Sequence, residues 1–132
     1  MPIINVFLSI SNYAYALFVT KRFFFMKIAL LGYGKMGNTI DALVAEAYSN
    51  KHEVVLRLNS QNEAAVTVQD LAKADVAIEF SQPEAAFRNI MRCFDANLPV
   101  VCGTTAWLEK LNEVEKRCEN ENKAFFYAAN FS

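Results

Sequence analysis

The feature that most constrains the fold is a glycine-rich turn between a short apolar run and a helix-like segment. Residues 27–31 (KIALL) are mostly apolar, and Gly32, Gly34 and Gly37 follow them directly in a GxGxxG pattern. From residue 36 to about residue 48, apolar side chains recur every three or four positions, which is typical of a helix with one buried face. A strand, a glycine turn and a helix in this order are typical of the first unit of a dinucleotide-binding domain.

Glycine is needed at each of these three positions for a different physical reason. Gly32 permits a tight turn, Gly34 lets the backbone approach a pyrophosphate, and Gly37 lets the helix pack closely on the strand. The N-terminus of the helix then faces the anion, whose charge its free N–H groups stabilise. We therefore predict cofactor contacts along the whole turn, which is made of Gly32, Tyr33, Gly34, Lys35, Met36 and Gly37.

Strand-like and helix-like segments alternate through the rest of the chain. Short apolar runs predict further strands at residues 53–58, 75–80, 99–102 and 124–127. Helical patterns lie near residue 70, over about 82–97 with Ser81 as the cap, and over about 107–118. Because the strands are continuously apolar, both faces of the sheet should be covered. The 132 residues therefore predict one α/β domain with a Rossmann-like, doubly wound parallel sheet.

Gly103, Thr104 and Thr105 follow one of the later strands. Carboxyl ends of parallel strands meet at one edge of the sheet, and ligands of open α/β sheets bind there. The threonine hydroxyls can reach a nicotinamide ribose or carboxamide, and Thr105 can also cap the next helix. Asn130 and Phe131, at the end of the last strand, are expected at the same edge. The sequence thus predicts a second group of cofactor contacts.

The second strand ends at a position that often selects between NAD and NADP. Many dinucleotide-binding folds place an acid there, about 20 residues past the glycines, to hold the adenosine ribose. Here the position holds Asn59, followed by Ser60. An amide does not repel a 2′-phosphate, and Lys35 or Arg57 can attract one, although Arg57 is equally explained as a solvated strand end. The cofactor is therefore NAD or NADP, with the preference open.

No catalytic or metal-binding constellation is visible in the sequence. Cys93, Cys102 and Cys118 show no CxxC spacing, and the single His52 has no second ligand nearby, so we expect no metal site. Unpatterned cysteines are typical of a reducing compartment, which predicts a cytoplasmic protein. A formal net charge of −1 gives no electrostatic reason to expect nucleic acid or membrane as the main partner. A small-molecule dinucleotide is the expected partner.

The first 25 residues differ from the rest of the chain. They are mostly apolar, and their two bases, Lys21 and Arg22, follow the apolar stretch instead of preceding it as in a signal peptide. Interrupting Asn and Ser residues disfavour a spanning helix, although a weak anchor stays open. Because a strand begins directly at Met26, we interpret residues 1–25 as upstream translation or an unstructured extension. Residues 26–132 would be the NAD(P)-binding domain.

Four segments, MKIALLGYGKMG, DVAIEFSQPEA, VVCGTTAW and FFYAANFS, together resemble one family over residues 26–132. That family is dihydrodipicolinate reductase, also called 4-hydroxy-tetrahydrodipicolinate reductase, and the resemblance is to its N-terminal domain. The resemblance implies an NAD(P)H-dependent reductase of the bacterial diaminopimelate–lysine pathway. The sequence departs from the family at Asn59, where an acid is commoner, and at Glu79, where Asp is usual.

The resemblance also implies which residues contact the cofactor. The turn from Gly32 to Gly37 would hold the pyrophosphate, while Asn59 and Ser60 would contact the adenosine ribose or its phosphate. Gly103, Thr104 and Thr105 would contact the nicotinamide end. Further contacts are expected from Phe80 and, at the hinge to the next domain, from Ala128, Ala129, Asn130 and Phe131.

The family's second domain carries a His-His pair, a Lys and a Ser-Gly-Thr segment that bind and protonate the substrate. It would begin just after Ser132, so we expect a truncated reading frame or a separated cofactor domain that is inactive alone. The full-length family is expected to be homo-oligomeric. Two alternatives stay open: the cofactor domain of another NAD(P) dehydrogenase, and a non-catalytic NAD(H)-binding regulatory module.

Overall fold

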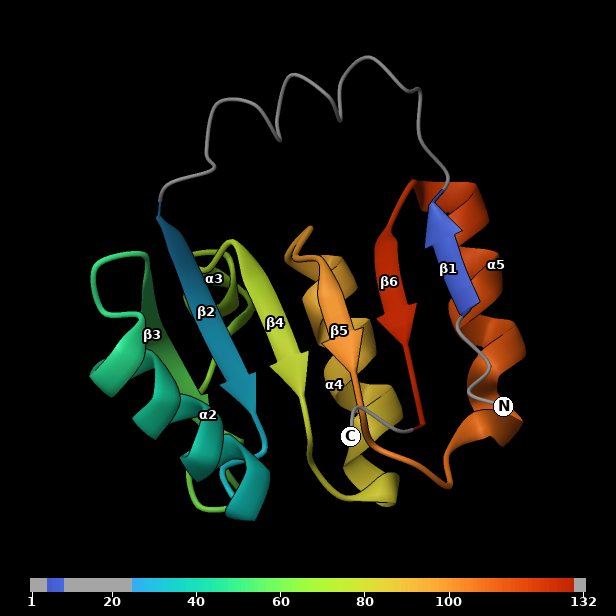
Figure 1. Ribbon diagram of the computed structural model, residues 1–132. Helices are drawn as coiled ribbons and strands as arrows, with labels where there is room; N and C mark the ends of the chain where they lie inside the picture. The colour runs from blue at the N-terminus through green and yellow to red at the C-terminus, as the bar shows by residue number, and fades with distance from the viewer. Residues whose placement is uncertain (1–4, 9–24, 130–132) are drawn as a thin grey trace.

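The computed structural model describes residues 5–8 and 25–129, and its centre is one six-stranded sheet (Figure 1). The strands are β1 (Asn5–Leu8), β2 (Met26–Leu31), β3 (His52–Leu58), β4 (Val76–Glu79), β5 (Val100–Cys102) and β6 (Ala124–Tyr127). Their order across the sheet is β1-β6-β5-β4-β2-β3. Strands β2 to β6 are parallel to one another, and β1 pairs antiparallel with β6.

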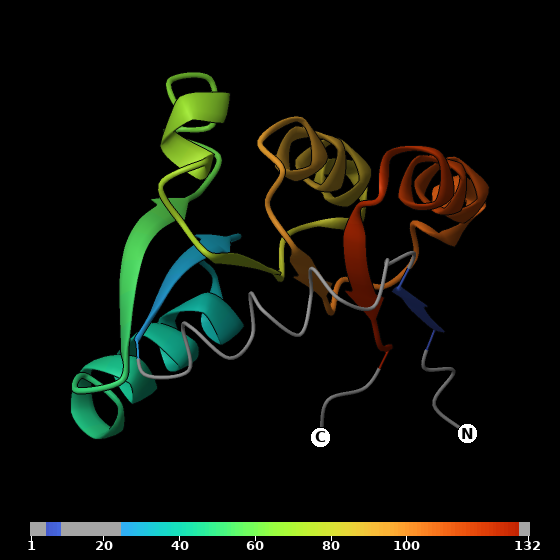
Figure 2. The same cartoon turned by 90° about the horizontal axis from the view of Figure 1, so that it is seen from above.

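Helices cover the two faces of this sheet unequally. The helical segments are α2 (Lys35–Ala47), α3 (Val68–Leu71), α4 (Pro83–Asp95), the 3₁₀ turn η1 (Leu108–Lys110) and α5 (Leu111–Glu121). Figure 2 shows α3, α4 and α5 on one face and α2 on the other. The predicted Rossmann-like, doubly wound sheet is therefore confirmed.

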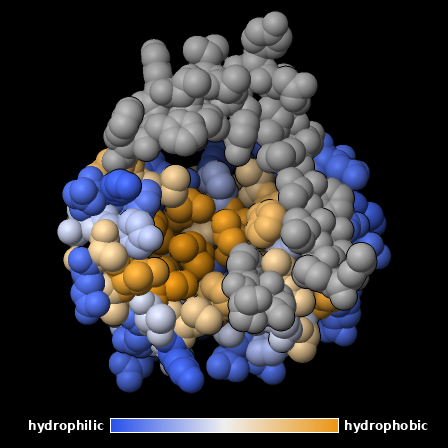
Figure 3. All heavy atoms as spheres, viewed as in Figure 1, coloured by the Kyte–Doolittle hydropathy of each residue, from blue (hydrophilic) through white to orange (hydrophobic). Residues whose placement is uncertain are grey.

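Alternating side chains of the strands point to opposite faces of the sheet and belong to two separate hydrophobic cores. In β2, Ala29 and Leu31 belong to the larger cluster, while Ile28 and Leu30 belong to the smaller one. The larger cluster includes Ile90 and Phe94 of α4 and Val114 and Cys118 of α5, whereas the smaller one includes Val44 of α2. On the α2 side, apolar residues also gather near the middle of the face seen in Figure 3. Such period-two sorting is what a strand between two helical layers requires.

The strand order reverses next to β2, and this reversal positions the functional site. From β2 the chain passes outward to β3 and then returns to β4 on the other side of β2. The connections that leave β2 and β4 therefore diverge to opposite sides and leave a crevice beyond the carboxyl ends of these strands. Ligands of doubly wound sheets bind at this topological switch point.

Two local expectations differ from the structure. Gln82, not Ser81, is the N-cap of α4, and its side chain forms no capping hydrogen bond. Thr105 caps no helix, because the chain turns at Ala106 (φ 62°) and η1 begins only at Leu108. Ser81 and Thr105 lie in the two loops of the crevice instead.

Part of the N-terminal segment is ordered against the sheet edge. Asn5–Leu8 pairs with Ala124–Tyr127 as an antiparallel strand, where the sequence predicted no structure. Residues 9–24 lie outside the described residues, so the domain boundary at Met26 stays a prediction. In the described ranges, no helix has both the length and the apolar character needed to cross a membrane.

Candidate functional site

The glycine turn is packed tightly against the loop that leaves β4. Gly32 has φ +95°, a conformation that side-chain-bearing residues rarely adopt, and a Cβ there would lie 2.2 Å from the Phe80 carbonyl oxygen. A Cβ on Gly37 would lie 2.3 Å from the Gly32 carbonyl oxygen. These two glycines are therefore required by the close approach of strand, turn and helix.

Gly34 is different, because nothing lies within 4 Å of the Cβ position that it lacks. It is the N-cap of α2, whose 13 residues carry no acid in the first turn and no side-chain cap. Asn38 donates its side-chain amide to the carbonyl oxygens of Tyr33 (3.1 Å) and Gly34 (2.8 Å), which holds the turn in place. The first-turn N–H groups of α2 and the open space at Gly34 together suit a bound anion.

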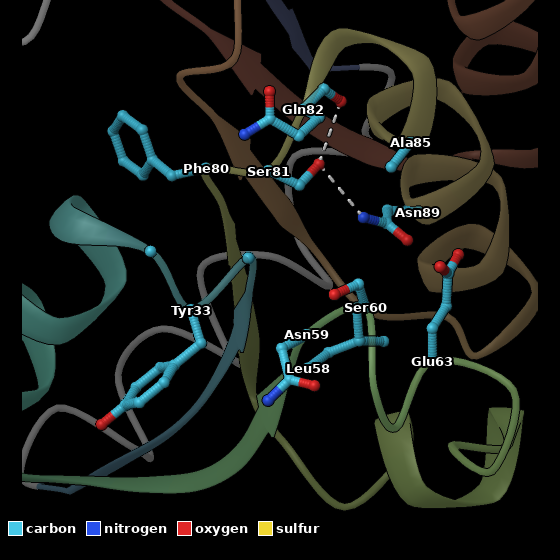
Figure 4. Close-up of a pocket in the computed structure, with 12 residues that line it drawn as sticks. Tyr33, Leu58, Asn59, Ser60, Glu63, Phe80, Ser81, Gln82, Ala85 and Asn89 are labelled. Atoms are coloured by element: carbon cyan, nitrogen blue, oxygen red, sulfur yellow. Dashed lines mark hydrogen bonds between the residues drawn. The ribbon is translucent and has the colours of Figure 1, made fainter.

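A pocket of about 280 Å³ opens on one side of this turn (Figure 4); we call it the glycine-loop pocket. Tyr33 and Asn59 lie on one side of it and Ser81 and Asn89 on the other. Its lining consists of Gly32, Tyr33, Gly34, Leu58, Asn59, Ser60, Glu63, Phe80, Ser81, Gln82, Ala85 and Asn89. The pocket thus joins the ends of β2, β3 and β4 with the first turns of α4.

A second pocket of about 290 Å³ lies toward β5; we call it the Gly103 pocket. It is lined by Met36, Phe80, Ser81, Pro83, Gly103, Thr104 and Thr105. Phe80 and Ser81 line both pockets, so the two form neighbouring parts of one crevice. A Cβ on Gly103 would lie 2.1 Å from the Phe80 ring, so this ring lies directly against the Gly103 backbone.

A buried carboxylate lies beneath the crevice. Glu79 ends β4 with 0% of its surface exposed, and its Oε1 accepts the Ser81 N–H (3.0 Å) and the Asn89 amide (3.4 Å). The Cys102 thiol donates to Oε2 (3.4 Å), and no ion pair joins Glu79 to a cation of the described residues. Burial is the main cause of the raised pKa of the Cys102 thiol, and the Glu79 charge adds to it.

Thr104 connects the two loops of the crevice. Its Oγ1 accepts the Ser81 N–H (2.9 Å) and lies 3.4 Å from the Ser81 carbonyl oxygen, to which it donates. The Trp107 indole N–H donates to the Thr104 carbonyl oxygen (2.6 Å), and the indole packs edge-on against Phe125 and Tyr127 in the larger core. The Gly103 loop is therefore fixed to both the core and the Phe80–Ser81 loop.

A charged pair, Asp41 and Arg57, lies next to Tyr33 of the glycine turn. Arg57 donates Nε (2.5 Å) and Nη2 (2.8 Å) to the two carboxylate oxygens of Asp41, and the Tyr33 hydroxyl donates to Asp41 Oδ2 (2.5 Å). The hydrogen bond from Arg57 is the main cause that lowers the pKa of Asp41. The hydrogen bond to Asp41 is the main cause that raises the pKa of Tyr33. Arg57 is thus paired with Asp41, while its side chain stays 45% exposed near the end of the strand.

Comparison with known proteins agrees with this geometry. Residues 26–131 match the family described as dihydrodipicolinate reductase, N-terminus. The chain belongs to the dihydrodipicolinate reductase family. This family uses NAD(P)H, and the matched region is its nucleotide-binding domain, so the predicted NAD or NADP cofactor is confirmed.

Relatives of this family cover most of the chain but extend well beyond it. A 4-hydroxy-tetrahydrodipicolinate reductase from Christiangramia forsetii is 45% identical over 107 residues, which are 81% of this chain and 43% of that protein. A 4-hydroxy-tetrahydrodipicolinate reductase from Staphylococcus aureus is 35% identical over 114 residues, covering 81% of this chain and 45% of its own length. The chain therefore spans less than half the length of these relatives.

The structure gathers most of the residues predicted to bind the cofactor of this reductase family. Ten of them line the two pockets: Gly32, Tyr33, Gly34, Met36, Asn59, Ser60, Phe80, Gly103, Thr104 and Thr105. Lys35 and Gly37 lie in the first turn of α2. Ala128 and Ala129 follow β6, and the Ala128 N–H donates to the Cys102 carbonyl oxygen. Asn130 and Phe131 lie outside the described residues.

Three polar residues of the site in this reductase domain were not predicted. Asp41, Glu79 and Asn89 each interrupt an apolar pattern: Asp41 lies between Gly37 and Val44 on α2, and Asn89 is 1% exposed next to Ile90. A polar residue on a buried face needs a partner, which is the signal that could have identified them.

Proposed function

We propose that this chain is the NAD(P)H-binding domain of a 4-hydroxy-tetrahydrodipicolinate reductase. The observation that carries the proposal is the open space beside Gly34. Of the four glycines in the sequence, three have an atom within 2.3 Å of the Cβ position that they lack, whereas Gly34 has open space around it. An unfilled position at the N-terminus of a 13-residue helix, at the switch point of the sheet, suits a pyrophosphate that must approach the backbone.

The two pockets suit the two halves of a dinucleotide. The pyrophosphate would bind at Gly34 and the first-turn N–H groups of α2, with the adenosine in the glycine-loop pocket near Asn59 and Ser60. The nicotinamide end would bind in the Gly103 pocket. Thr105 is exposed and can donate its hydroxyl, whereas Thr104 is 6% exposed and already bonded to Ser81. Thr105 is therefore the proposed contact, and Thr104 positions the loop.

The residues of this chain would bind and orient, while the substrate would be held elsewhere. Bound NAD(P)H supplies the hydride in a reduction of this kind. Phe80 and Gly103 pack against each other and would form one side of the nicotinamide pocket. Substrate binding and proton donation are assigned to the remainder of the complete, homo-oligomeric reductase, since this chain covers only 43% and 45% of the two relatives.

The domain boundary and the compartment belong to the same proposal. Residues 26–132 would form the cofactor domain, and β1 would be an addition at the sheet edge. Cys93, Cys102 and Cys118 are all free and buried, which suits a reducing cytoplasm.

The proposal is tested with Gly34→Val. A branched side chain there would occupy the pyrophosphate position, and we expect at least tenfold weaker NAD(P)H binding, about 1.4 kcal/mol. Binding can be followed by energy transfer from Trp107, the only tryptophan of the chain, to the reduced nicotinamide. Ala45→Val, on the exposed side of the same helix, is the matched control and should bind normally. Unchanged affinity in a folded Gly34→Val protein would refute the proposed function.

A further inference from the structure

The cluster of Tyr33, Asp41 and Arg57 joins three elements around the proposed adenosine end of the crevice. Tyr33 belongs to the glycine turn and lines the glycine-loop pocket, but its ring points away from Ser81 and Asn89, on the far side of that pocket (Figure 4). Its hydroxyl reaches Asp41 on α2, and Asp41 in turn holds Arg57 of β3. The Asp41 side chain is 14% exposed and the Arg57 side chain 45% exposed.

Arg57 is close enough to the ribose position to matter for cofactor choice. It precedes Asn59 by two residues, which places both on the same side of the chain at the end of β3, about 7 Å apart. Its carbonyl oxygen accepts the Asn62 amide (2.8 Å) in the turn that follows Asn59. A long guanidinium side chain on this residue can in principle extend toward a phosphate at the ribose 2′ position.

The observed side chain extends the other way. Nε and Nη2 are bonded to Asp41, and Nη1 donates to the carbonyl oxygen of Val54 (3.3 Å), three residues back toward the start of β3. The guanidinium is therefore directed away from the carboxyl end of the strand, where the cofactor would lie. Its charge is compensated by the Asp41 carboxylate, which is partly exposed.

Given the proposed function, we propose that Asp41 is a specificity-determining residue that withholds Arg57 from the cofactor. A 2′-phosphate carries nearly two negative charges. To use Arg57 it must break a bidentate pair, and otherwise it lies near the Asp41 carboxylate without the guanidinium. The wild-type site consequently favours the dinucleotide that lacks the 2′-phosphate. Asp41 acts through Arg57 and touches no cofactor, so it is a positioning residue.

The experiment measures the dissociation constants of NADH and NADPH for the whole chain and four variants at one ionic strength. Asp41→Ala should raise the affinity for NADPH relative to NADH by about tenfold, because Arg57 becomes available. Adding Arg57→Met to Asp41→Ala should abolish that gain. Asp95→Ala removes an equal charge from the Arg117 pair on α4 and α5, and should leave the ratio unchanged.

Asp41→Asn, which keeps the shape of the side chain, decides the matter if Asp41→Ala does not fold. Because its neutral amide cannot hold the Arg57 charge, the NADPH to NADH affinity ratio should rise, as in Asp41→Ala. An unchanged or lowered ratio in folded Asp41→Asn would overturn the inference. An unchanged or lowered ratio in folded Asp41→Ala would overturn it equally. If the wild-type chain binds neither nucleotide, the proposed function itself fails.

Discussion

Two carboxylates flank the crevice, Glu79 beneath it and Asp41 at its rim, and their surroundings differ in burial and in charge. Glu79 is fully buried and accepts hydrogen bonds from neutral groups of Ser81, Asn89 and Cys102. Asp41 is partly exposed and is paired with the charged Arg57. We call the buried set around Glu79, together with Gly32, Gly37 and Thr104, the floor, and the set around Asp41, with Gly34 and Asn59, the rim.

This difference predicts which residues should control the stability of the domain and which should control its choice of ligand. Losing a hydrogen bond of a buried group costs free energy, because the remaining partner cannot hydrogen-bond to water instead. Exposed or half-exposed ion pairs contribute little to stability, about 0–1 kcal/mol. Floor substitutions should therefore destabilise the domain, whereas rim substitutions should leave it folded and change what it binds.

The largest effect is expected at the floor, for Gly32→Ala. A side chain at φ +95° is strained, by roughly 1–3 kcal/mol, and its Cβ would meet the Phe80 carbonyl oxygen at 2.2 Å. We expect a loss of about 3 kcal/mol or more in the free energy of unfolding, measured by urea denaturation. Gly34→Ala is the matched rim variant and should lose less than about 1 kcal/mol. Equal losses in the two variants would remove the distinction between floor and rim.

At the rim, Asn59→Asp should change cofactor preference and not stability. Asn59 Oδ1 accepts the N–H groups of Gln61 (2.8 Å) and Asn62 (3.1 Å), and a carboxylate oxygen can keep both bonds. The new charge accepts the ribose hydroxyls and repels a 2′-phosphate, so the NADH to NADPH affinity ratio should rise about tenfold, about 1.4 kcal/mol. Titration with both nucleotides measures it. An equal effect on both would contradict the placement of Asn59 at the ribose.

Thr104→Val tests the floor without creating a cavity. The substitution keeps the shape but removes the acceptor of the Ser81 N–H, which then relies on Glu79 alone. We expect a loss of about 1 kcal/mol in unfolding free energy. Thr105→Val, next to it and exposed, should have little effect on stability. A Thr104→Val protein as stable as wild type would show that the Ser81 contact is dispensable.

Sequence patterns were sufficient for most of the elements and for the loops that line the two pockets. The apolar run at residues 124–127 is strand β6 as predicted, and the predicted strand at 53–58 differs from β3 by one residue. Local periodicity and glycine spacing carry this information, because both depend on neighbours in the chain. The parallel order then brings the predicted loops to one edge.

The floor and the rim could not be predicted, because their contacts join residues distant in sequence. Asp41 and Arg57 are 16 residues apart, and Ser81 and Thr104 are 23 apart. The residues of each pair come into contact only when β2 pairs with β3 and β4 with β5 in their actual registers. For the same reason the sequence could not distinguish the packed Gly32 from the open Gly34. The pairing of β1 with β6 joins opposite ends of the chain and has no local signature.

The smallest effect is expected when the Asp41 charge at the rim is removed. The pH dependence of the unfolding free energy shows whether that charge is responsible. Asp41→Asn keeps the shape of the side chain, so the difference in unfolding free energy from wild type should be below about 1 kcal/mol.

The pH dependence follows from the pKa of Asp41. Because Arg57 lowers the native pKa of Asp41, the stabilisation is complete above the ordinary value of 3.8. It is lost as the pH falls through the lower native pKa. The raised pKa of Tyr33 leaves that hydroxyl protonated below its ordinary value of 10.0. The difference between wild type and Asp41→Asn should therefore be constant from about pH 5 to about pH 9 and shrink only below pH 3.8. Urea denaturation of both proteins across this range measures it, and a difference that changed near neutral pH would require another titrating group at the rim.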